Sequence, residues 1–341
     1  MKGIFYVFSG TGNTDKVCRA LADEWQKRGV ETTYVRLRRG EPSPDPRGFD
    51  RVAVGYPVHA FNAPEPVLDL LKRWERADGT LLYFVKTSGE PVRLNDCSCA
   101  RPAALAQKRG FTVAGEFHYV MPYNIIFRHS DGMAARMWQA ALRRIPGDAA
   151  AMAEGKKTPW PHGPFKRAFS FALRIEQAAM PHIGRHFRAT ERCVGCGKCA
   201  KVCPQGNIRM EDGRPVFGKS CVGCMACAFY CPADAVKTGL LNGWRVNGAY
   251  SFEGAPAADG EICRYCNKAY RRYFAAAEAL PPPAAEPQTA VRVAEATPLD
   301  KMQTVARATE SVPAAQDPVL SEASAPIPAP APPPAAGRPQ N

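Results

Sequence analysis

The sequence predicts an α/β protein with a doubly wound parallel sheet, followed by a small α+β domain and a disordered C-terminal tail. Three observations predict this class. Short apolar runs alternate with amphipathic helical segments over residues 1–127, cysteines repeat with fixed spacing over residues 188–240, and residues 278–341 are rich in proline and alanine without an aromatic residue. A basic helical bridge at 128–187 and an extension at 241–277 account for the rest of the chain.

The spacing of apolar residues predicts each element of the first part. Ile4–Phe8 is a short apolar run that ends in a turn of serine, glycine and threonine, and Thr14–Lys27 carries its apolar residues on one helical face. Further strands are expected at 32–37, 51–56, 81–87 and 111–120, and further helices at 66–75 and 99–109. Five strands joined by helices within about 120 residues favour a parallel sheet covered on both faces, with ligands beyond the carboxyl ends of the strands.

The cysteines of residues 188–240 form a tandem repeat. Each repeat has three cysteines separated by two residues and a fourth that directly precedes a proline: Cys193, Cys196, Cys199 and Cys203, then Cys221, Cys224, Cys227 and Cys231. Three thiolates at this spacing can hold one face of a 4Fe–4S cluster, while the fourth crosses to the other cluster. We therefore expect Cys231 to complete the first set and Cys203 the second.

Zinc and disulfides are the alternatives for these cysteines. Structural zinc usually takes two separated cysteine pairs, and disulfides are disfavoured in a reducing compartment. Two 4Fe–4S clusters are therefore the preferred interpretation. Outside the repeat, Cys18 is expected to be a small core residue. Cys97, Cys99, Cys263 and Cys266 are either independent thiols or, if the two segments meet, a four-thiolate site.

Residues 9–14, here called the phosphate loop, lie between the first strand and the first helix. They are Ser9, Gly10, Thr11, Gly12, Asn13 and Thr14. Glycines permit a tight turn, amides and hydroxyls can point inward, and the dipole of the following helix favours a phosphate. The loop lacks the third glycine of a dinucleotide fingerprint and the Lys-Ser/Thr pair of a P-loop.

The phosphate loop resembles the S/T-x-T-G-x-T loop of flavodoxins, which holds the phosphate of FMN. The resemblance covers about residues 1–127 and implies a flavodoxin-like fold. It also implies that the loops after the third and fourth strands clasp the flavin ring: Pro57, Val58, His59, Ala60, Phe61 and Asn62, and Thr87, Ser88 and Gly89. His59 and Phe61 either stack on the flavin or pack within their loop.

Together with the cysteine repeat, residues 1–240 resemble the flavodoxin-domain ferredoxins of anaerobic microbes, in which a flavodoxin-like domain is fused to a bacterial-type two-cluster ferredoxin domain. The resemblance implies electron transport with FMN and two 4Fe–4S clusters. It identifies no partner.

The formal net charge of +13 restricts the partners. No basic stripe is interleaved with aromatic residues, which argues against nucleic acid. A solvated basic face, an acidic redox partner protein and peripheral contact with anionic lipid headgroups remain open. The aromatic residues Phe165, Phe169 and Phe171 of the bridge fit either a packed helix or a helix at a membrane surface.

No apolar run is long enough for a transmembrane helix, and the N-terminus lacks the features of a signal peptide, so a cytoplasmic location is expected.

We expect a protein that passes low-potential electrons between FMN, two 4Fe–4S clusters and redox partners. One alternative is an FMN-dependent reductase of a small substrate that uses the clusters as an internal wire. The other is a redox-sensing or docking module without flavin. No acid–base or nucleophile–base pair is evident, so no catalytic residue is predicted and a carrier is favoured over an enzyme.

Overall fold

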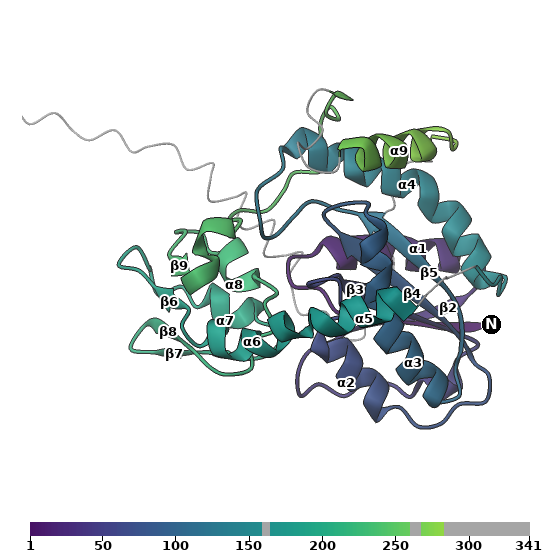
Figure 1. Cartoon of the computed structure of the whole chain (residues 1–341), viewed down its shortest axis with the longest axis horizontal. Coiled ribbons are helices and arrows are strands. Elements are labelled where there is room, and N and C mark those ends of the chain that lie inside the picture. The colour runs from purple at the N-terminus through teal and green to yellow at the C-terminus, as the bar shows by residue number, and fades with distance from the viewer. Residues whose placement is uncertain (159–163, 260–266, 283–341) are drawn as a thin grey trace, which may run out of the picture.

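A computed structural model describes residues 1–158, 164–259 and 267–282. Its main body is a five-stranded parallel sheet with the strand order β2-β1-β3-β4-β5 (Figure 1). The strands are β1 (Lys2–Val7), β2 (Glu31–Arg36), β3 (Arg51–Pro57), β4 (Leu81–Ser88) and β5 (Thr112–Val120). This is the flavodoxin-like order, so the predicted fold class is confirmed.

Helices cover both faces of the sheet because successive strand residues point to opposite sides. Phe5 and Val7 face α1 (Asn13–Lys27) and α4 (Asp131–Ala153). Ile4 and Tyr6 face the opposite core, to which α2 (Glu65–Arg73) and α3 (Ala100–Lys108) contribute. The sheet is thus sandwiched between two helical layers, as the sequence predicted.

Helix α4 lies in the segment expected to be a basic bridge, and the structure places it against the sheet. An apolar stripe that includes Trp138, Leu142 and Ile145 joins the core around Trp25. The final described helix, α9 (Asn267–Glu278), packs on α4 through the buried Tyr270 and Phe274.

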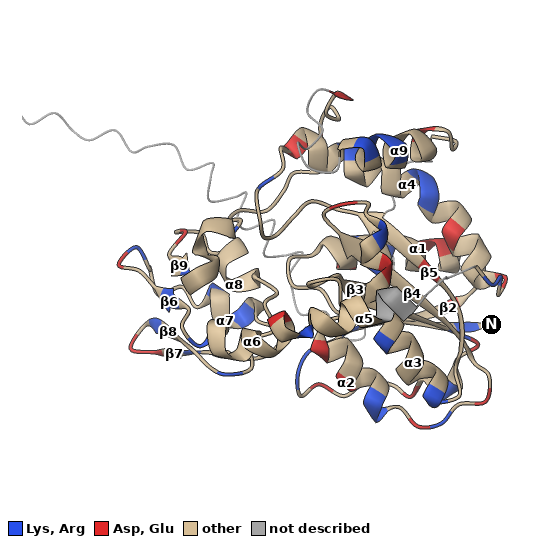
Figure 2. Ribbon diagram, in the orientation of Figure 1, with Lys and Arg blue, Asp and Glu red and all other residues tan. Residues whose placement is uncertain are grey.

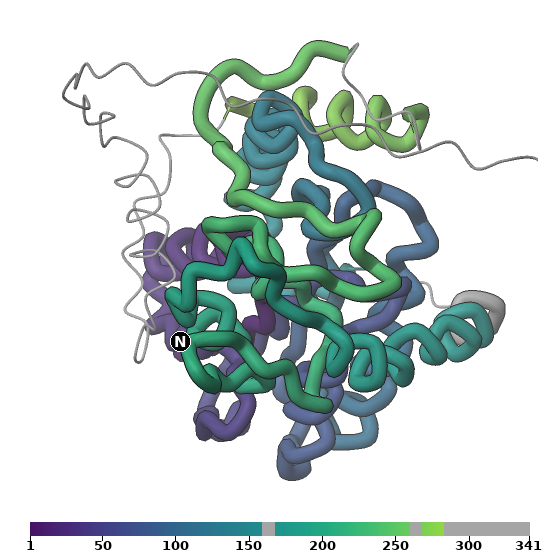
Figure 3. The backbone as a smooth tube through the Cα atoms, turned by 90° about the vertical axis from the view of Figure 1, so that its left-hand side faces the viewer, coloured from purple at the N-terminus to yellow at the C-terminus, as the bar shows by residue number. Residues whose placement is uncertain are grey.

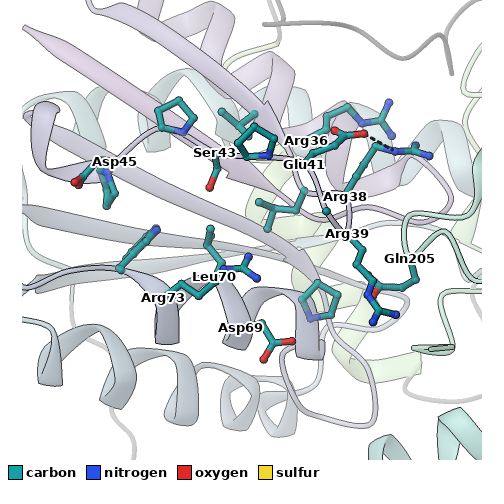
Figure 4. A pocket seen from close by; sticks show the side chains of 18 of the residues that line it. Arg36, Arg38, Arg39, Glu41, Ser43, Asp45, Asp69, Leu70, Arg73 and Gln205 are labelled. Atoms are coloured by element: carbon teal, nitrogen blue, oxygen red, sulfur yellow. Dashed lines mark ion pairs between the residues drawn. The ribbon is translucent and has the colours of Figure 1, made fainter. Parts of the chain in front are cut away.

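The connection from β2 to β3 has no α-helix. Prolines at 42, 44 and 46 remove amide donors that a helix would need, and only the short η1 (Pro46–Gly48) forms. A surface cavity of about 560 Å³ lies between this loop and α2. Arg38 and Arg39 line one end of it, beside Gln205 of the cysteine-bearing domain (Figure 4).

The cysteine-bearing domain is small and α+β, as expected. Two antiparallel strand pairs, β6 (Arg188–Ala189) with β9 (Val236–Lys237) and β7 (Ile208–Glu211) with β8 (Arg214–Phe217), flank α7 (Lys198–Val202) and α8 (Ala226–Phe229). Phe187, Ile208 and Phe217 belong to its own apolar core. Helices α5 (Pro164–Ala172) and α6 (Arg174–Gly184) lead into it, η3 (Gly239–Trp244) follows it, and η2 (Arg93–Cys99) precedes α3 in the sheet domain.

The cysteine-bearing domain lies in front of the sheet domain when viewed from its own side (Figure 3). Across the described residues, no helix has the length and apolar character needed to span a bilayer. The predicted tail beyond residue 282, Cys263 and Cys266 lie outside the described residues.

Candidate cofactor sites

Four thiols from the two repeats surround one cavity in the cysteine-bearing domain. They form the first thiol set: Cys193, Cys196, Cys199 and Cys231. Gly195 and Gly197 take left-handed backbone conformations, each with φ of 68°, and a Cβ on Gly195 would lie 3.0 Å from the carbonyl oxygen of Gly213. These glycines let the chain turn tightly between successive cysteines. Cys196 is exposed, so this set faces solvent.

The other four thiols form the second thiol set: Cys203, Cys221, Cys224 and Cys227. Burial and the neighbouring thiols of Cys203 and Cys221 raise the pKa of Cys224. Burial and the same neighbours, together with Cys224, raise the pKa of Cys227. Three members are only 9% exposed, Cys203, Cys224 and Cys227. The structure therefore places the fourth cysteine of each repeat beside the first three cysteines of the other repeat.

The chemistry of both sets suits an iron–sulfur cluster. Burial and the thiols of Cys196, Cys231 and Cys193 raise the pKa of Cys199 to about 11. Because neighbouring thiolates repel one another, joint ionisation requires bound cations, and metal binding releases the protons. Backbone amides are ready to stabilise the sulfur charge. The amide of Ala235 donates to Cys231 Sγ at 3.2 Å, and that of Asn207 donates to Cys203 Sγ at 3.4 Å.

Over residues 1–158, 164–259 and 267–282, no three His, Cys, Asp or Glu side chains are arranged to hold a single metal ion. None of the cysteines described there forms a disulfide. Cys18, Cys97 and Cys99 are buried, with no exposed surface. A joint site of Cys97 and Cys99 with Cys263 and Cys266 stays a prediction, since the latter two lie outside the described residues.

The phosphate loop carries hydrogen-bond donors suited to an anion. Gly12 begins α1 in a left-handed conformation, and no side chain caps the helix, so its first amides and its dipole are available. Thr11 is only 7% exposed. Within the described parts of the chain, no residue forms a hydrogen bond to its hydroxyl. The amide of Gly12 donates to Ser9 Oγ at 3.2 Å, which closes the turn. This donor set fits a phosphate.

The three loops named by the flavodoxin resemblance meet at the carboxyl ends of β1, β3 and β4. The hydroxyls of Thr14 and Thr87 share a hydrogen bond of 2.7 Å, and the amide of Val58 donates to the Thr87 carbonyl at 2.8 Å. His59 and Asn62 exchange two backbone hydrogen bonds around Ala60 and Phe61, which both have positive φ. Burial lowers the pKa of His59 to about 4, so its imidazole is neutral near pH 7.

Other parts of the chain cover the two loops expected at the flavin ring. Ser170 Oγ donates to Asn62 Oδ1 at 2.6 Å, and Phe169 packs on Phe61 with 5.6 Å between ring centroids. Helix α5 is thus a packed helix on this face, although Phe171 is 67% exposed. Tyr123 lies over the fourth-strand loop, where a Cβ on Gly89 would be 2.2 Å from its ring.

The second thiol set lies against the phosphate loop. A Cβ on Gly10 would lie 2.7 Å from Cys224 Cβ and 2.8 Å from the Cys224 carbonyl oxygen. The Tyr230 hydroxyl donates to the Thr11 carbonyl at 2.7 Å. The side-chain amide of Asn124 donates to the Cys224 carbonyl at 3.2 Å. Sequence reasoning missed Tyr123, Asn124, Ser170 and Tyr230, since no motif marks residues that meet the loops from distant segments.

Comparison with known proteins agrees with the cysteine geometry. Residues 192–235 match the family described as a 4Fe-4S dicluster domain. The similarity is to a domain that holds 4Fe–4S clusters. It gives the chain a redox role in electron transfer. The chain therefore joins a sheet of flavodoxin-like strand order to an iron–sulfur domain.

No curated protein matches the chain. Three solved structures similar to it are flavodoxins. A short-chain flavodoxin associated with a bacterial microcompartment is 16% identical, covering 45% of this chain and 97% of that one, with a TM-score of 0.34. A flavodoxin from the domain Archaea is 15% identical, covering 45% and 99%, with a TM-score of 0.33. Flavodoxin 1 from Bacillus cereus is 13% identical, covering 45% and 98%, with a TM-score of 0.33.

Proposed function

We propose that this protein is a cytoplasmic electron carrier that passes low-potential electrons between FMN, two 4Fe–4S clusters and partner redox proteins. The contact between Gly10 of the phosphate loop and Cys224 of the second thiol set carries the proposal. It brings the loop expected to hold FMN and the cysteines expected to hold a cluster into van der Waals contact. A carrier with several redox groups needs them close together.

Each thiol set would hold one cluster, and the phosphate loop would hold the FMN phosphate. When bound, a cluster supplies one-electron chemistry and FMN supplies one- or two-electron chemistry. The chain would place these groups near one another and would shield the second thiol set and the phosphate loop from water. Residues 188–240 act as the ferredoxin-type domain, and residues 1–127, completed by α4 and α9, act as the flavin-binding domain.

The first thiol set is the natural point of exchange with a partner, because Cys196 is exposed whereas Cys224 and Cys227 are buried. Exposed arginines lie close along the chain to the cavity of the first set: Arg188, Arg192, Arg209 and Arg214. Basic segments are visible on β6 and β8 in Figure 2. Carboxylates share this face, because Arg209 pairs with Glu211 and Arg192 pairs with Asp234. The association of a redox partner with so charged a face would weaken as salt is added.

Side chains from other segments cover the two loops expected to hold the flavin ring. This observation favours a second candidate, a docking or redox-sensing module that holds no flavin. In this candidate, Tyr123 over Gly89 and Phe169 against Phe61 occupy the loops in place of a ring. The two candidates differ in one property, which is whether the loops open for FMN.

Titration of full-length, cluster-loaded protein with FMN and with riboflavin separates these candidates. The carrier binds FMN at least tenfold more tightly than riboflavin, because only FMN has the phosphate that the Ser9–Thr14 loop would hold. Equal affinity for the two, or no binding of either, contradicts the carrier and supports the flavin-free module.

A further inference from the structure

Gly10 has a structural role different from that of the other glycine in the phosphate loop. Gly12 has φ of 94°, a conformation that favours glycine, whereas Gly10 is not among the glycines with positive φ. A side chain at position 10 would instead collide with Cys224, whose Sγ would be 3.2 Å from the new Cβ and whose Cβ and carbonyl oxygen would be closer still. Position 10 is therefore glycine because Cys224 of the second set lies directly against the loop.

Hydrogen bonds on both sides hold this contact in place. Tyr230, shortly after Cys227 in sequence, donates to the Thr11 carbonyl, and Asn124 donates to the Cys224 carbonyl. At the other end of the second set, Arg38 donates to the carbonyl oxygen of Lys201 at 3.1 Å, and the amide of Arg39 donates to the Pro204 carbonyl at 2.9 Å. The second set cannot move away from the loop without breaking these bonds.

The contact lies in a region with little water. Ser9, Thr11 and Cys224 are all less than a tenth exposed. The nearby Asp15 is already paired with Arg19 at 2.8 Å and with Arg36 at 3.4 Å, so those two guanidiniums neutralise a carboxylate. A phosphate in the loop and negative charge on the second set would therefore be screened weakly, and they would repel each other.

We propose that a phosphate bound in the Ser9–Thr14 loop and an electron added at the second thiol set disfavour each other, with Gly10 as the residue that positions the two in contact. The proposal rests on the function proposed above. One electron from an external reductant such as dithionite adds one unit of negative charge at the iron–sulfur group, and no bond forms or breaks. By linkage, phosphate must lower the reduction potential of the second set by the same free energy by which the added electron weakens phosphate binding.

The test uses full-length protein with both sets loaded and any flavin removed, and inorganic phosphate is the probe. We expect phosphate to bind about tenfold more weakly to the dithionite-reduced protein than to the oxidised protein, within the usual range of coupling between sites. A tenfold change corresponds to about 59 mV for a one-electron couple. Paramagnetic resonance during a redox titration should show that shift for the second set only, and the first set serves as an internal control.

FMN and riboflavin distinguish the two sources of phosphate. Both inorganic phosphate and FMN should lower the potential of the second set, whereas riboflavin should not. A shift with inorganic phosphate alone would mean that the loop is a site for free phosphate and would contradict the proposed flavin function, but it would leave the coupling intact.

Variants separate positioning from simple binding. Gly10→Ala should keep eight irons and still bind phosphate. The ratio of its phosphate affinities in the oxidised and reduced states should fall several-fold, because the new side chain displaces Cys224. Tyr230→Phe removes the hydrogen bond to the Thr11 carbonyl and should give a smaller loss. Gly48→Ala is the matched control, since a Cβ there meets nothing within 4 Å, and its coupling should equal that of the unaltered protein. If Gly10→Ala does not fold, the unaltered protein and Tyr230→Phe still decide the question.

Equal phosphate affinity in both redox states overturns this inference while leaving the proposed function intact. Equal shifts in the reduction potentials of both sets on phosphate binding also overturn it, because they would indicate a general charge effect. If neither phosphate nor FMN binds in either state, the proposed function itself fails, and the inference fails with it.

Discussion

The two thiol sets come from the same repeated motif, but the chain surrounds them differently. The first set lines a cavity at the surface and includes the exposed Cys196. The second set has three members that are 9% exposed and lies against the phosphate loop through Gly10. Spacing in sequence therefore determines which cysteines meet, whereas packing against the sheet domain determines what each set can contact. The first set is placed for exchange with a partner and the second for exchange within the protein.

The largest expected effect comes from removing a crossing cysteine. Cys203→Ala should abolish the second cluster and lower the iron content from about eight to about four per chain, because Cys203 belongs with the cysteines of the other repeat. Cys199→Ala, the matched change four residues earlier, should instead abolish the first cluster. Iron analysis and paramagnetic resonance measure both variants. Loss of the first cluster's signal in Cys203→Ala would show that the sets do not cross.

The next largest effect is a loss of FMN affinity that leaves the clusters of both sets unchanged. Replacing Thr11 and Thr14 together by alanine removes two hydroxyls from the phosphate loop, each contributing about 1.5–3 kcal/mol to a charged ligand. FMN affinity, measured by titration, should fall a hundredfold or more, while riboflavin affinity and the cluster absorbance stay unchanged. Thr32→Ala, in the edge strand β2, is the control. Unchanged FMN affinity in the double variant would mean that the loop no longer holds phosphate.

Accessibility gives a third contrast between the sets. An iron chelator added to the oxidised protein should remove iron in two phases. The fast phase should come from the first set, because Cys196 is exposed, and the slow phase from the second set, because the sheet domain covers it. Cys203→Ala, which retains only the first cluster, should show the fast phase alone. A single phase in the unaltered protein, or a slow phase in this variant, would contradict the contrast in burial.

The smallest effect concerns the sheet domain alone. Burial raises the pKa of Glu90 to about 7, so this carboxyl binds a proton more strongly in the folded state than in the unfolded state. Its contribution to the free energy of unfolding is therefore greatest at low pH and declines as pH rises from about 4.5 to about 7. Glu90→Gln should remove this decline, which is on the order of 3 kcal/mol, as measured by denaturant unfolding, and should leave the iron content of both sets unchanged. An identical pH profile in the variant would show that Glu90 does not titrate in this range.

Local patterns were sufficient to predict the strands and the helices between them. Apolar alternation and turn residues placed β3 at 51–56, and the structure has it at Arg51–Pro57. The alternation predicted a parallel sheet covered on both faces, and the resemblance of the phosphate loop to that of flavodoxins implied the strand order. The spacing of the cysteines likewise predicted which thiols meet, since the proline after each fourth cysteine turns the chain toward the other set.

Contacts between distant segments could not be predicted in this way. The basic, helix-forming composition of residues 128–187 predicts a bridge packed against its neighbours, but it does not indicate that Trp138, Leu142 and Ile145 of α4 join the core of the sheet. Tyr230 reaches the Thr11 carbonyl across the domain boundary, and Tyr123 covers Gly89. None of these residues carries a local signal for its partner, because each contact depends on how the two domains dock. The role of Gly10 was equally hidden, since its motif alone suggests only a tight turn.

The content of iron, acid-labile sulfide and flavin in anaerobically purified, full-length protein tests the central claim most directly. Two complete thiol sets and one phosphate loop predict about eight irons, about eight sulfides and one FMN per chain, with separate cluster and flavin bands in the visible spectrum. Mainly zinc, or four irons with all eight cysteines intact, would contradict the two-cluster account. Eight irons in a protein that takes up no FMN on reconstitution would retain the clusters but contradict the carrier in favour of the flavin-free module.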